Sequence, residues 1–308
     1  MSFSLEIKQE LSEITNGARH CDIAELSAVF GSGCEIVKIS GKTIIRMHTE
    51  NHHAALRCAG LIKKIFGISP QVLIATSVNP LTKDRGASAY TVRVSGNDAE
   101  KILNAAGFHQ DDTLSPLTVS GNCCKRAFIR GAFIVSGSLN NPEKSYHAEF
   151  ISPRAEIGDF LLGVLNSFSL NAKPLNRKGN HVAYIKDSRG ILDLLNVMQA
   201  HRALLSLANV KVFKDVRNDV NRKVNFEAAN LNKTISASVK QFEEISLIKD
   251  VKGLSFLNAR LREAAELRLR YPDASLTEIG AMFETPVSKS GVNHRFRKIS
   301  EIAGSIYD

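Results

Sequence analysis

Polar and basic side chains gather in one short segment near the end of the sequence, where their types and spacing suit contacts with a nucleic acid. The segment "VSKSGVNHRFRKI" offers Ser288, Lys289, Ser290, Asn293, His294, Arg295, Arg297 and Lys298. An asparagine amide can pair with adenine, and an arginine or lysine with guanine, in the major groove. Hydroxyl groups at a helix N-terminus suit phosphate oxygens. We therefore expect these eight residues to form a DNA-binding face.

Two short helices joined by a tight turn are expected to position that face. Ser275 and Glu278 have the spacing of a capping box at the start of the first helix, and Ser288 is the expected N-cap of the second. A longer helix is predicted before them, over residues 254–273. The pattern indicates a helix-turn-helix whose second helix is the recognition helix. A solvated basic helix in an ordinary three-helix bundle is the alternative.

Composition and charge narrow the class of partner. The chain has 308 residues, a formal net charge of +9 and a pI near 9.3, which favours an anionic partner. Double-stranded DNA is preferred over RNA, because the proposed recognition face lacks aromatic residues for base stacking. We expect no membrane partner, since no apolar run approaches the length of a membrane span. The first residues, "MSFSLEIKQELSEI", predict an amphipathic helix instead of a signal peptide, and hence a cytoplasmic, nucleoid-associated protein.

The five cysteines show no familiar pattern. Cys21, Cys34, Cys58, Cys123 and Cys124 are odd in number and include no C-x-x-C pair. Their spacing supports neither a disulfide framework nor a zinc site, so buried thiols are expected. No metal ligand and no cofactor is predicted.

The first two thirds of the sequence contain an internal repeat. The segment "AELSAVFGSG" at 24–33 matches "FIRGAFIVSG" at 128–137 with an offset of 104 residues, and "NHHAALRCAGLIKKIFG" aligns with "AEIGDFLLGVLNSFSL" at the same offset. A third pair, starting at Tyr90 and His181, aligns after a longer loop at 76–88 in the first copy. Each copy predicts the order α-β-β-α-β-β-α, hence an antiparallel sheet covered by helices on one face. Chance similarity of amphipathic helices is the alternative.

Small residues recur on the first helix of each copy. Glycine inside a helix costs about 1 kcal/mol relative to alanine, so two of them suggest that another backbone approaches closely. We expect the two helices to pack at a pseudo-twofold axis. The facing residues would be Gly131, Ala132 and Gly137 in one helix and Ser27, Ala28 and Gly33 in the other.

These paired small-residue helices resemble those of the LAGLIDADG homing endonucleases. In that family, the residue before the last glycine of the motif is a metal-binding aspartate. The matching positions here are Ser136 and Ser32. Phosphodiester hydrolysis of this type needs Mg²⁺ held by anionic oxygens, which a neutral hydroxyl does not replace. Glu25 and Glu35 lie nearby but have no equivalent in the other copy. The resemblance therefore implies a nuclease-like fold without catalysis.

A polar segment connects the two regions. Residues 210–234, "VKVFKDVRNDVNRKVNFEAANLNKT", place apolar residues at helical spacing opposite a face of lysine, arginine and asparagine. Asparagine favours helices poorly, so we expect either a break near residues 218–221 or polar contacts with phosphate or the other domain. A solvated connecting helix is an equal alternative.

Over its whole length the sequence resembles the WhiA family. The segments "RGAF", "NPEKSYHAEF", "RNDVNRKVNFEAANLNKT" and "YPDASLTEIGAMF…PVSKSGVNHRFRKI" carry the resemblance. It implies a degenerate LAGLIDADG domain joined to a helix-turn-helix, with roles in sporulation, transcription, cell division or chromosome segregation.

Taken together, these features predict an α+β protein with three parts. Residues 1–112 and 113–218 form two pseudo-symmetric LAGLIDADG-like halves, and 219–308 form the helix-turn-helix domain. The expected function is non-catalytic DNA binding in transcription regulation, with another transcription or division protein as a second partner. The rivals are a scaffold or chromosome-organising factor that acts through protein contacts, and, less favoured, an active endonuclease.

Overall fold

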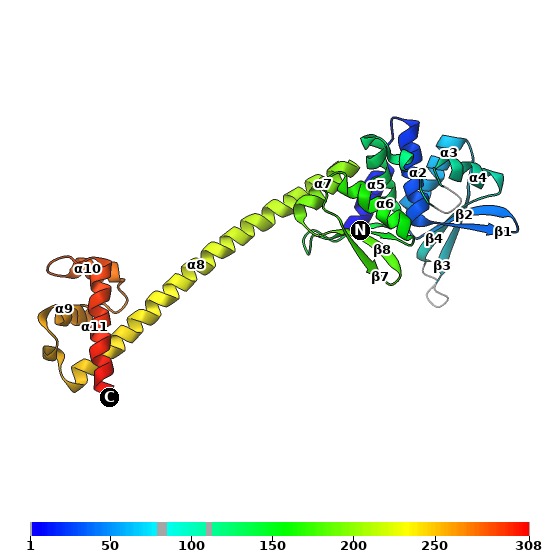
Figure 1. The fold of residues 1–308 in the computed structure, drawn as a ribbon. Helices are drawn as coiled ribbons and strands as arrows, with labels where there is room; N and C mark the ends of the chain where they lie inside the picture. The colour runs from blue at the N-terminus through cyan, green and yellow to red at the C-terminus, as the bar shows by residue number, and fades with distance from the viewer. Residues whose placement is uncertain (1, 79–84, 109–112, 308) are drawn as a thin grey trace. The chain divides into compact units, whose positions relative to one another are not determined.

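The computed structural model describes residues 2–78, 85–108 and 113–307, which belong to two units (Figure 1). The first unit comprises residues 1–214 and the second residues 215–308. Each has its own cluster of buried apolar side chains. Within the described residues, no helix is long and apolar enough to cross a membrane.

The first unit contains the predicted repeat, preceded by one extra helix, α1 (Phe3–Ser12). The first copy runs through α2 (Arg19–Gly33), β1 (Cys34–Ile39), β2 (Lys42–Thr49), α3 (His52–Phe66), β3 (Gln71–Val78), β4 (Arg85–Ser95) and α4 (Asn97–Ala105). After a 3₁₀ turn at Pro116–Val119, the second copy runs through α5 (Asn122–Ser136), β5 (Gly137–Leu139), β6 (Ala148–Ser152), α6 (Ala155–Asn166), β7 (Lys173–Arg177), β8 (Asn180–Ile185) and α7 (Ser188–Met198). The predicted order of elements is confirmed.

The two sheets share one topology. Both are antiparallel and four-stranded, with orders β1-β2-β4-β3 and β5-β6-β8-β7. In the first sheet Ile45 pairs with Val94, and in the second Phe150 pairs with Ala183, each between the two central strands. The turn at Ser40-Gly41 has φ values of 49° and 75°, as a two-residue hairpin requires. Part of the longer loop predicted in the first copy, residues 79–84, lies outside the described residues.

Helices α2 and α5 lie side by side at the centre of the unit (Figure 1) and are buried over most of their length. A Cβ on Gly131 would overlap the backbone carbonyl oxygen of Glu25, and one on Gly33 would lie 2.7 Å from the Cβ of Val135. The predicted close approach of the helices is confirmed, but the facing residues differ from those expected. Gly131 meets Glu25, not Ser27. Gly137 is crowded by Phe133 of its own helix, because it lies where α5 turns into β5.

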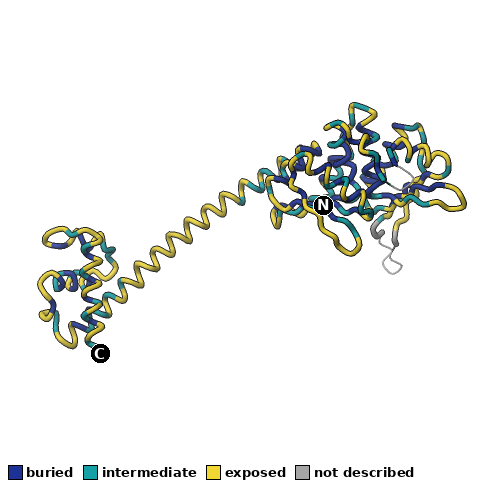
Figure 2. The backbone as a smooth tube through the Cα atoms, in the orientation of Figure 1, coloured by how far each residue is buried: buried dark blue, intermediate teal, exposed yellow. Residues whose placement is uncertain are grey.

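Apolar side chains from the sheets and the covering helices form the core of the first unit. The buried residues appear as dark blue backbone in Figure 2. Phe133 of α5 and Phe150 of β6 meet edge to face with ring centroids 5.6 Å apart. Such an arrangement adds about 0.5–1.5 kcal/mol to the effect of burial alone. The core therefore fixes the end of α5 against the second sheet.

Helix α8 (His201–Val251) crosses the boundary between the two units. Its start is capped by Glu10, whose carboxylate accepts hydrogen bonds from the backbone nitrogens of Arg202 and Ala203 at 2.7 and 3.0 Å. The break expected near residues 218–221 is absent, so that alternative was wrong. Each asparagine costs well under about 1 kcal/mol in a helix, and the segment contains neither glycine nor proline.

The second unit completes its fold with three further helices. These are α9 (Ala259–Arg270), α10 (Leu276–Met282) and α11 (Lys289–Tyr307), preceded by a 3₁₀ turn at Leu254–Phe256. The helix predicted over residues 254–273 was therefore too long at both ends. Asn258 caps α9 by accepting a hydrogen bond from the nitrogen of Leu261 at 3.0 Å, and the helix ends two residues before Pro272.

Candidate nucleic-acid interface

The first helix of the predicted motif begins as its sequence indicates. Ser275 Oγ accepts a hydrogen bond from the nitrogen of Glu278 at 3.3 Å, while Glu278 Oε2 accepts one from the nitrogen of Ser275 at 2.7 Å. This is a complete capping box. Hydrogen bonding by Ser275 to the carboxyl group of Glu278, first from the backbone nitrogen and then from the side chain, lowers the pKa of that group. The start of α10 is thus marked by a local hydrogen-bond motif.

A close backbone contact defines the turn between α10 and α11. The nitrogen of Val287 donates to the carbonyl oxygen of Gly280 at 2.9 Å. A Cβ on Gly280 would overlap the carbonyl oxygen of Val287, so only glycine fits at this position. Ser288 Oγ then accepts a hydrogen bond from the nitrogen of Gly291 at 3.3 Å, which confirms Ser288 as the N-cap of α11.

The apolar side of α11 is anchored in the core of the second unit. Its buried residues Val292, Phe296 and Ile299 join a cluster with Ile245 and Ile248 of α8 and with apolar residues of α9 and α10. The opposite side of α11 faces solvent. Burial of one side therefore fixes which side chains the helix can present to a partner.

Seven of the eight residues predicted to bind DNA are exposed: Ser288, Lys289, Ser290, Asn293, His294, Arg297 and Lys298. The side chain of Arg297 has an i,i+4 ion pair with Glu301 at 3.4 Å. Arg295 differs from the others, because it is half-buried and its guanidinium lies 4.3 Å from the centroid of the Phe283 ring. The structure thus separates Arg295 from the exposed group.

Arg268 of α9 supports this motif, although nothing in the sequence marked it. Its side chain is 2% exposed. The guanidinium donates to Gln241 Oε1 at 3.1 Å and to the carbonyl oxygens of Pro272 and Ala274 at 3.1 and 2.6 Å. Burial lowers the pKa of this guanidinium. Arg268 therefore ties the loop before α10 to α8 and α9.

The two serines singled out at the nuclease-like positions lie where each central helix turns into a strand. Ser32 is buried, and its Oγ has no hydrogen-bond partner among the described residues. Ser136 Oγ donates to the carbonyl oxygen of Ala132 at 3.0 Å. Close to Ser32, Arg154 Nη2 donates to the carbonyl oxygens of Phe30 and Cys34 at 3.2 and 2.9 Å. The guanidinium of Arg154 thus caps the C-terminal end of α2.

A buried charge network lies between the central helices, and the sequence analysis did not foresee it. The Glu25 carboxylate accepts hydrogen bonds from Arg57 Nε at 2.5 Å and Arg57 Nη2 at 2.9 Å, and it forms an ion pair with Arg130 Nε at 3.4 Å. Asn16 Nδ2 donates to the same carboxylate at 2.8 Å. Burial lowers the pKa of Arg130, and the charge of Glu25 opposes that shift. Glu25 is thus a paired structural acid.

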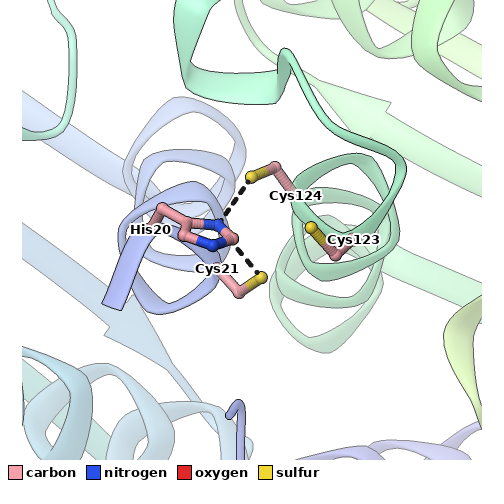
Figure 3. Close-up of side chains that lie close together, drawn as sticks. All are labelled: His20, Cys21, Cys123 and Cys124. Atoms are coloured by element: carbon pink, nitrogen blue, oxygen red, sulfur yellow. Dashed lines mark hydrogen bonds between the residues drawn. The ribbon is translucent and has the colours of Figure 1, made fainter. Parts of the chain in front are cut away.

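Four potential metal ligands meet at the N-terminal ends of α2 and α5 (Figure 3): His20, Cys21, Cys123 and Cys124. His20 Nδ1 lies 3.1 Å from Cys124 Sγ and 3.4 Å from Cys21 Sγ. Four of the five cysteines are buried as expected, but Cys123 is exposed, so that part of the prediction was wrong. Burial raises the pKa of the Cys21 thiol to about 12 and also raises that of Cys124. A hydrogen bond from Cys21 lowers the pKa of Cys123.

The fold and the exposed face of α11 together define a class of protein: a helix-turn-helix protein that also carries a duplicated α+β unit. Family models match in three consecutive parts. The WhiA N-terminal LAGLIDADG-like domain matches residues 19–109, the WhiA LAGLIDADG-like domain residues 125–217 and the WhiA C-terminal HTH domain residues 220–303. The chain belongs to the WhiA family.

Relatives and a solved structure agree with this assignment. A probable cell division protein WhiA of Thermoanaerobacter pseudethanolicus is 44% identical over 313 residues, which are 98% of this chain and 97% of the relative. One from Lachnoclostridium phytofermentans is 39% identical over 316 residues, 99% of each chain. The crystal structure of full-length DUF199/WhiA from Thermatoga maritima matches with a TM-score of 0.60 and 27% identity over 99% of both chains.

Proposed function

We propose that this chain is a non-catalytic, nucleoid-associated DNA-binding protein that regulates transcription in connection with cell division or chromosome segregation. The observation that carries the proposal is the face of α11, on which seven polar or basic residues are exposed after a turn that requires Gly280. Side chains of these types read base edges and neutralise phosphates in the major groove. The names of the relatives supply the link to cell division.

The surroundings of the two serines support the absence of catalysis. Catalytic Mg²⁺ needs anionic oxygen ligands, while Ser32 offers a neutral hydroxyl, and the guanidinium of Arg154 binds the backbone carbonyl oxygens of Phe30 and Cys34, two residues to either side of Ser32 in the chain. A fixed positive charge at that point opposes the binding of a divalent cation. Incubating plasmid DNA with the protein and Mg²⁺ or Mn²⁺ tests this. Cleavage that disappears when the exposed Glu35 is replaced would establish the rival nuclease function.

DNA binding is tested on α11 itself. We expect the triple variant Asn293→Ala, Arg297→Ala, Lys298→Ala to lose affinity for all duplexes, because it removes two cations and a base-reading amide. The log–log dependence of affinity on salt should become shallower by about 0.9 for each phosphate that the variant no longer neutralises. The single change Asn293→Ala should instead relax the preference at one base pair. Fluorescence anisotropy over a series of salt concentrations measures both.

The charge-matched control for this triple variant is Lys63→Ala with Lys101→Ala, both exposed on helices of the first unit. This control removes two positive charges and leaves α11 intact. Equal affinities for the triple variant and the wild type would show that α11 is not the recognition helix. Equal losses in the triple variant and the control would show that net charge, and no specific face, governs binding.

A second function, as a protein scaffold, is favoured by the edge of the first sheet. Strand β3 lies at that edge and exposes Val72, Leu73 and Ile74, with Ile74 64% exposed. Unpaired edge strands with apolar side chains favour pairing with another protein. Genome-wide occupancy, compared with transcript changes after deletion of the gene, separates the two functions. Occupancy without transcript changes would favour a chromosome-organising scaffold over a regulator.

A further inference from the structure

We infer that His20, Cys21, Cys123 and Cys124 form a zinc site that links the two halves of the repeat. The nitrogen and sulfur atoms that these residues offer all lie within 4.8 Å of one another. Two of the ligands come from the first turn of α2 and two from the first turn of α5 (Figure 3). The inference is independent of the DNA-binding function.

The geometry of the four side chains is close to that of a bound ion. A tetrahedral zinc ion with Zn–S distances of about 2.3 Å and a Zn–N distance of about 2.0 Å separates its ligand atoms by roughly 3.5–3.8 Å. His20 Nδ1 already lies 3.1 and 3.4 Å from two of the sulfurs. The largest distance between two ligand atoms of the group exceeds the ligand–ligand distance in a tetrahedral zinc site by no more than about 1 Å. Small changes of side-chain rotamer would close the coordination shell.

The chemistry of the ligands selects the ion. Three thiolates and one imidazole form the Cys₃His set found in structural zinc sites. No oxygen ligand is in the set, which disfavours magnesium and calcium. An iron–sulfur cluster places several metal and sulfide atoms between its cysteines, so it requires sulfurs that are farther apart than these. A single soft tetrahedral ion fits best.

Two features of the surroundings favour metal binding: the helix ends near the sulfurs and a path by which an ion can enter. Cys21, Cys123 and Cys124 lie in the first turns of α2 and α5, where the helix dipoles partly offset the effect of burial, which raises the pKa of Cys21 and Cys124. A hollow of about 430 Å³ is lined in part by His20, Cys123 and Cys124 and leads to the group from the surface. His20 and Cys123 are exposed, while Cys21 and Cys124 are buried against the small residues Ala24 and Ala127.

The spacing of these residues explains why the sequence analysis did not predict a zinc site. The ligands occur as two adjacent pairs, His20-Cys21 and Cys123-Cys124, separated by about a hundred residues of chain. Neither pair has the two-residue gap of a C-x-x-C motif. Only the packing of α2 against α5 brings the two pairs together.

The test measures zinc bound to the full-length protein, purified under reducing conditions and titrated with Zn²⁺ alone. We expect one equivalent per chain, detected by mass spectrometry of the intact protein under native conditions and by competition with a chromophoric chelator. Co²⁺ in place of Zn²⁺ should give the thiolate-to-metal charge-transfer bands and the intense d–d bands of a tetrahedral site. In the wild type, Zn²⁺ should raise the Tm and a chelator should lower it again.

Variants locate the ion. His20→Ala and Cys123→Ser replace exposed side chains, so these proteins should fold, and each should bind Zn²⁺ more than about 100-fold more weakly. That loss exceeds the 10–100-fold effect typical of residues that only support a ligand. The controls His52→Ala, at an exposed position, and Cys58→Ser, at a buried one, lie outside the group and should retain wild-type affinity.

Three outcomes would overturn the inference. The first is an affinity of the wild type for Zn²⁺ that is no higher than that of the His20→Ala, Cys123→Ser double variant. The second is binding that is equally weakened in the controls. The third is a protein that forms a disulfide between Cys21 and Cys124 in air, seen as a loss of two hydrogen masses, and takes up no zinc when reduced.

Discussion

Some of the charged side chains that are at least partly buried in the first unit form ion pairs and others do not. Glu25 has two guanidinium groups, whereas Lys8 of α1 has neither an ion pair nor a hydrogen bond among the described residues. Burial lowers the pKa of the Lys8 ammonium group from its ordinary value of 10.5 to about 8. Between these two pH values the unfolded chain binds more protons than the native protein. The free energy of unfolding should therefore rise with pH in that window.

Replacing Lys8 tests whether the charge of this one residue lowers the free energy of unfolding. At pH 7 the native state carries the cost of a partly buried ammonium group, so Lys8→Met should raise the free energy of unfolding by about 1–3 kcal/mol. The gain should shrink as the pH rises above 8 and become small near 10.5. Urea unfolding at a series of pH values measures it, with Lys101→Met, at an exposed position on α4, as the control. A gain of the same size at every pH would mean that Lys8 is not destabilised by its charge.

At the scale of elements, the contact between α2 and α5 depends on the missing side chain of Gly131. Gly131→Ala should lower the free energy of unfolding by about 1–3 kcal/mol, because the obstructing atom is the backbone oxygen of Glu25 and cannot rotate away. Gly163→Ala, in the interior of α6, should have the opposite effect and stabilise by about 0.5–1 kcal/mol. Nothing lies within 4 Å of a Cβ built on Gly163. Urea unfolding compares the two variants, and stabilisation by both would contradict the close approach of the helices.

The elements themselves could largely be predicted from the sequence. Hydrophobic periodicity and the matching segments indicated the order of helices and strands in both copies, and the capping box at Ser275 indicated the start of α10. Boundaries were harder, since the apolar spacing from Leu254 continued through a 3₁₀ turn before α9. The roles of Glu25, Arg268 and the His20–Cys124 group could not be predicted. Glu25 and the His20–Cys124 group depend on contacts between residues far apart in the sequence, and Arg268 depends on the path of the chain after α9. Periodicity encodes neither.

At the scale of the whole molecule, the two units have separate hydrophobic cores. A change confined to one core should therefore affect the unfolding of that unit alone. Gly280→Ala should lower the Tm of the second unit, because a Cβ would overlap the carbonyl oxygen of Val287 in the turn. The corresponding loss is about 1–3 kcal/mol. Differential scanning calorimetry measures the effect as a shift of one of two transitions.

The control for this change lies in the same unit. Gly304 is in the interior of α11, and a Cβ there would meet nothing within 4 Å. Gly304→Ala should raise the Tm of the transition that Gly280→Ala lowers, by removing freedom from the unfolded chain. If either variant moved both transitions by the same amount, the two units would unfold as one cooperative body.

The asymmetry of the charge network bears on the ancestry of the repeat. At the offset of 104 residues, Glu25 corresponds to Ile129 and Arg130 to Leu26, so only one copy carries the acid and only the other carries its cross-helix base. In a homodimer of the first copy, Glu25 would keep Arg57 and lose only the cross-helix Arg130, whereas in a homodimer of the second copy Arg130 would have no carboxylate partner. Removing one member of a buried ion pair costs about 3–5 kcal/mol. The duplicated halves have become complementary, each fitted to the other and no longer to itself.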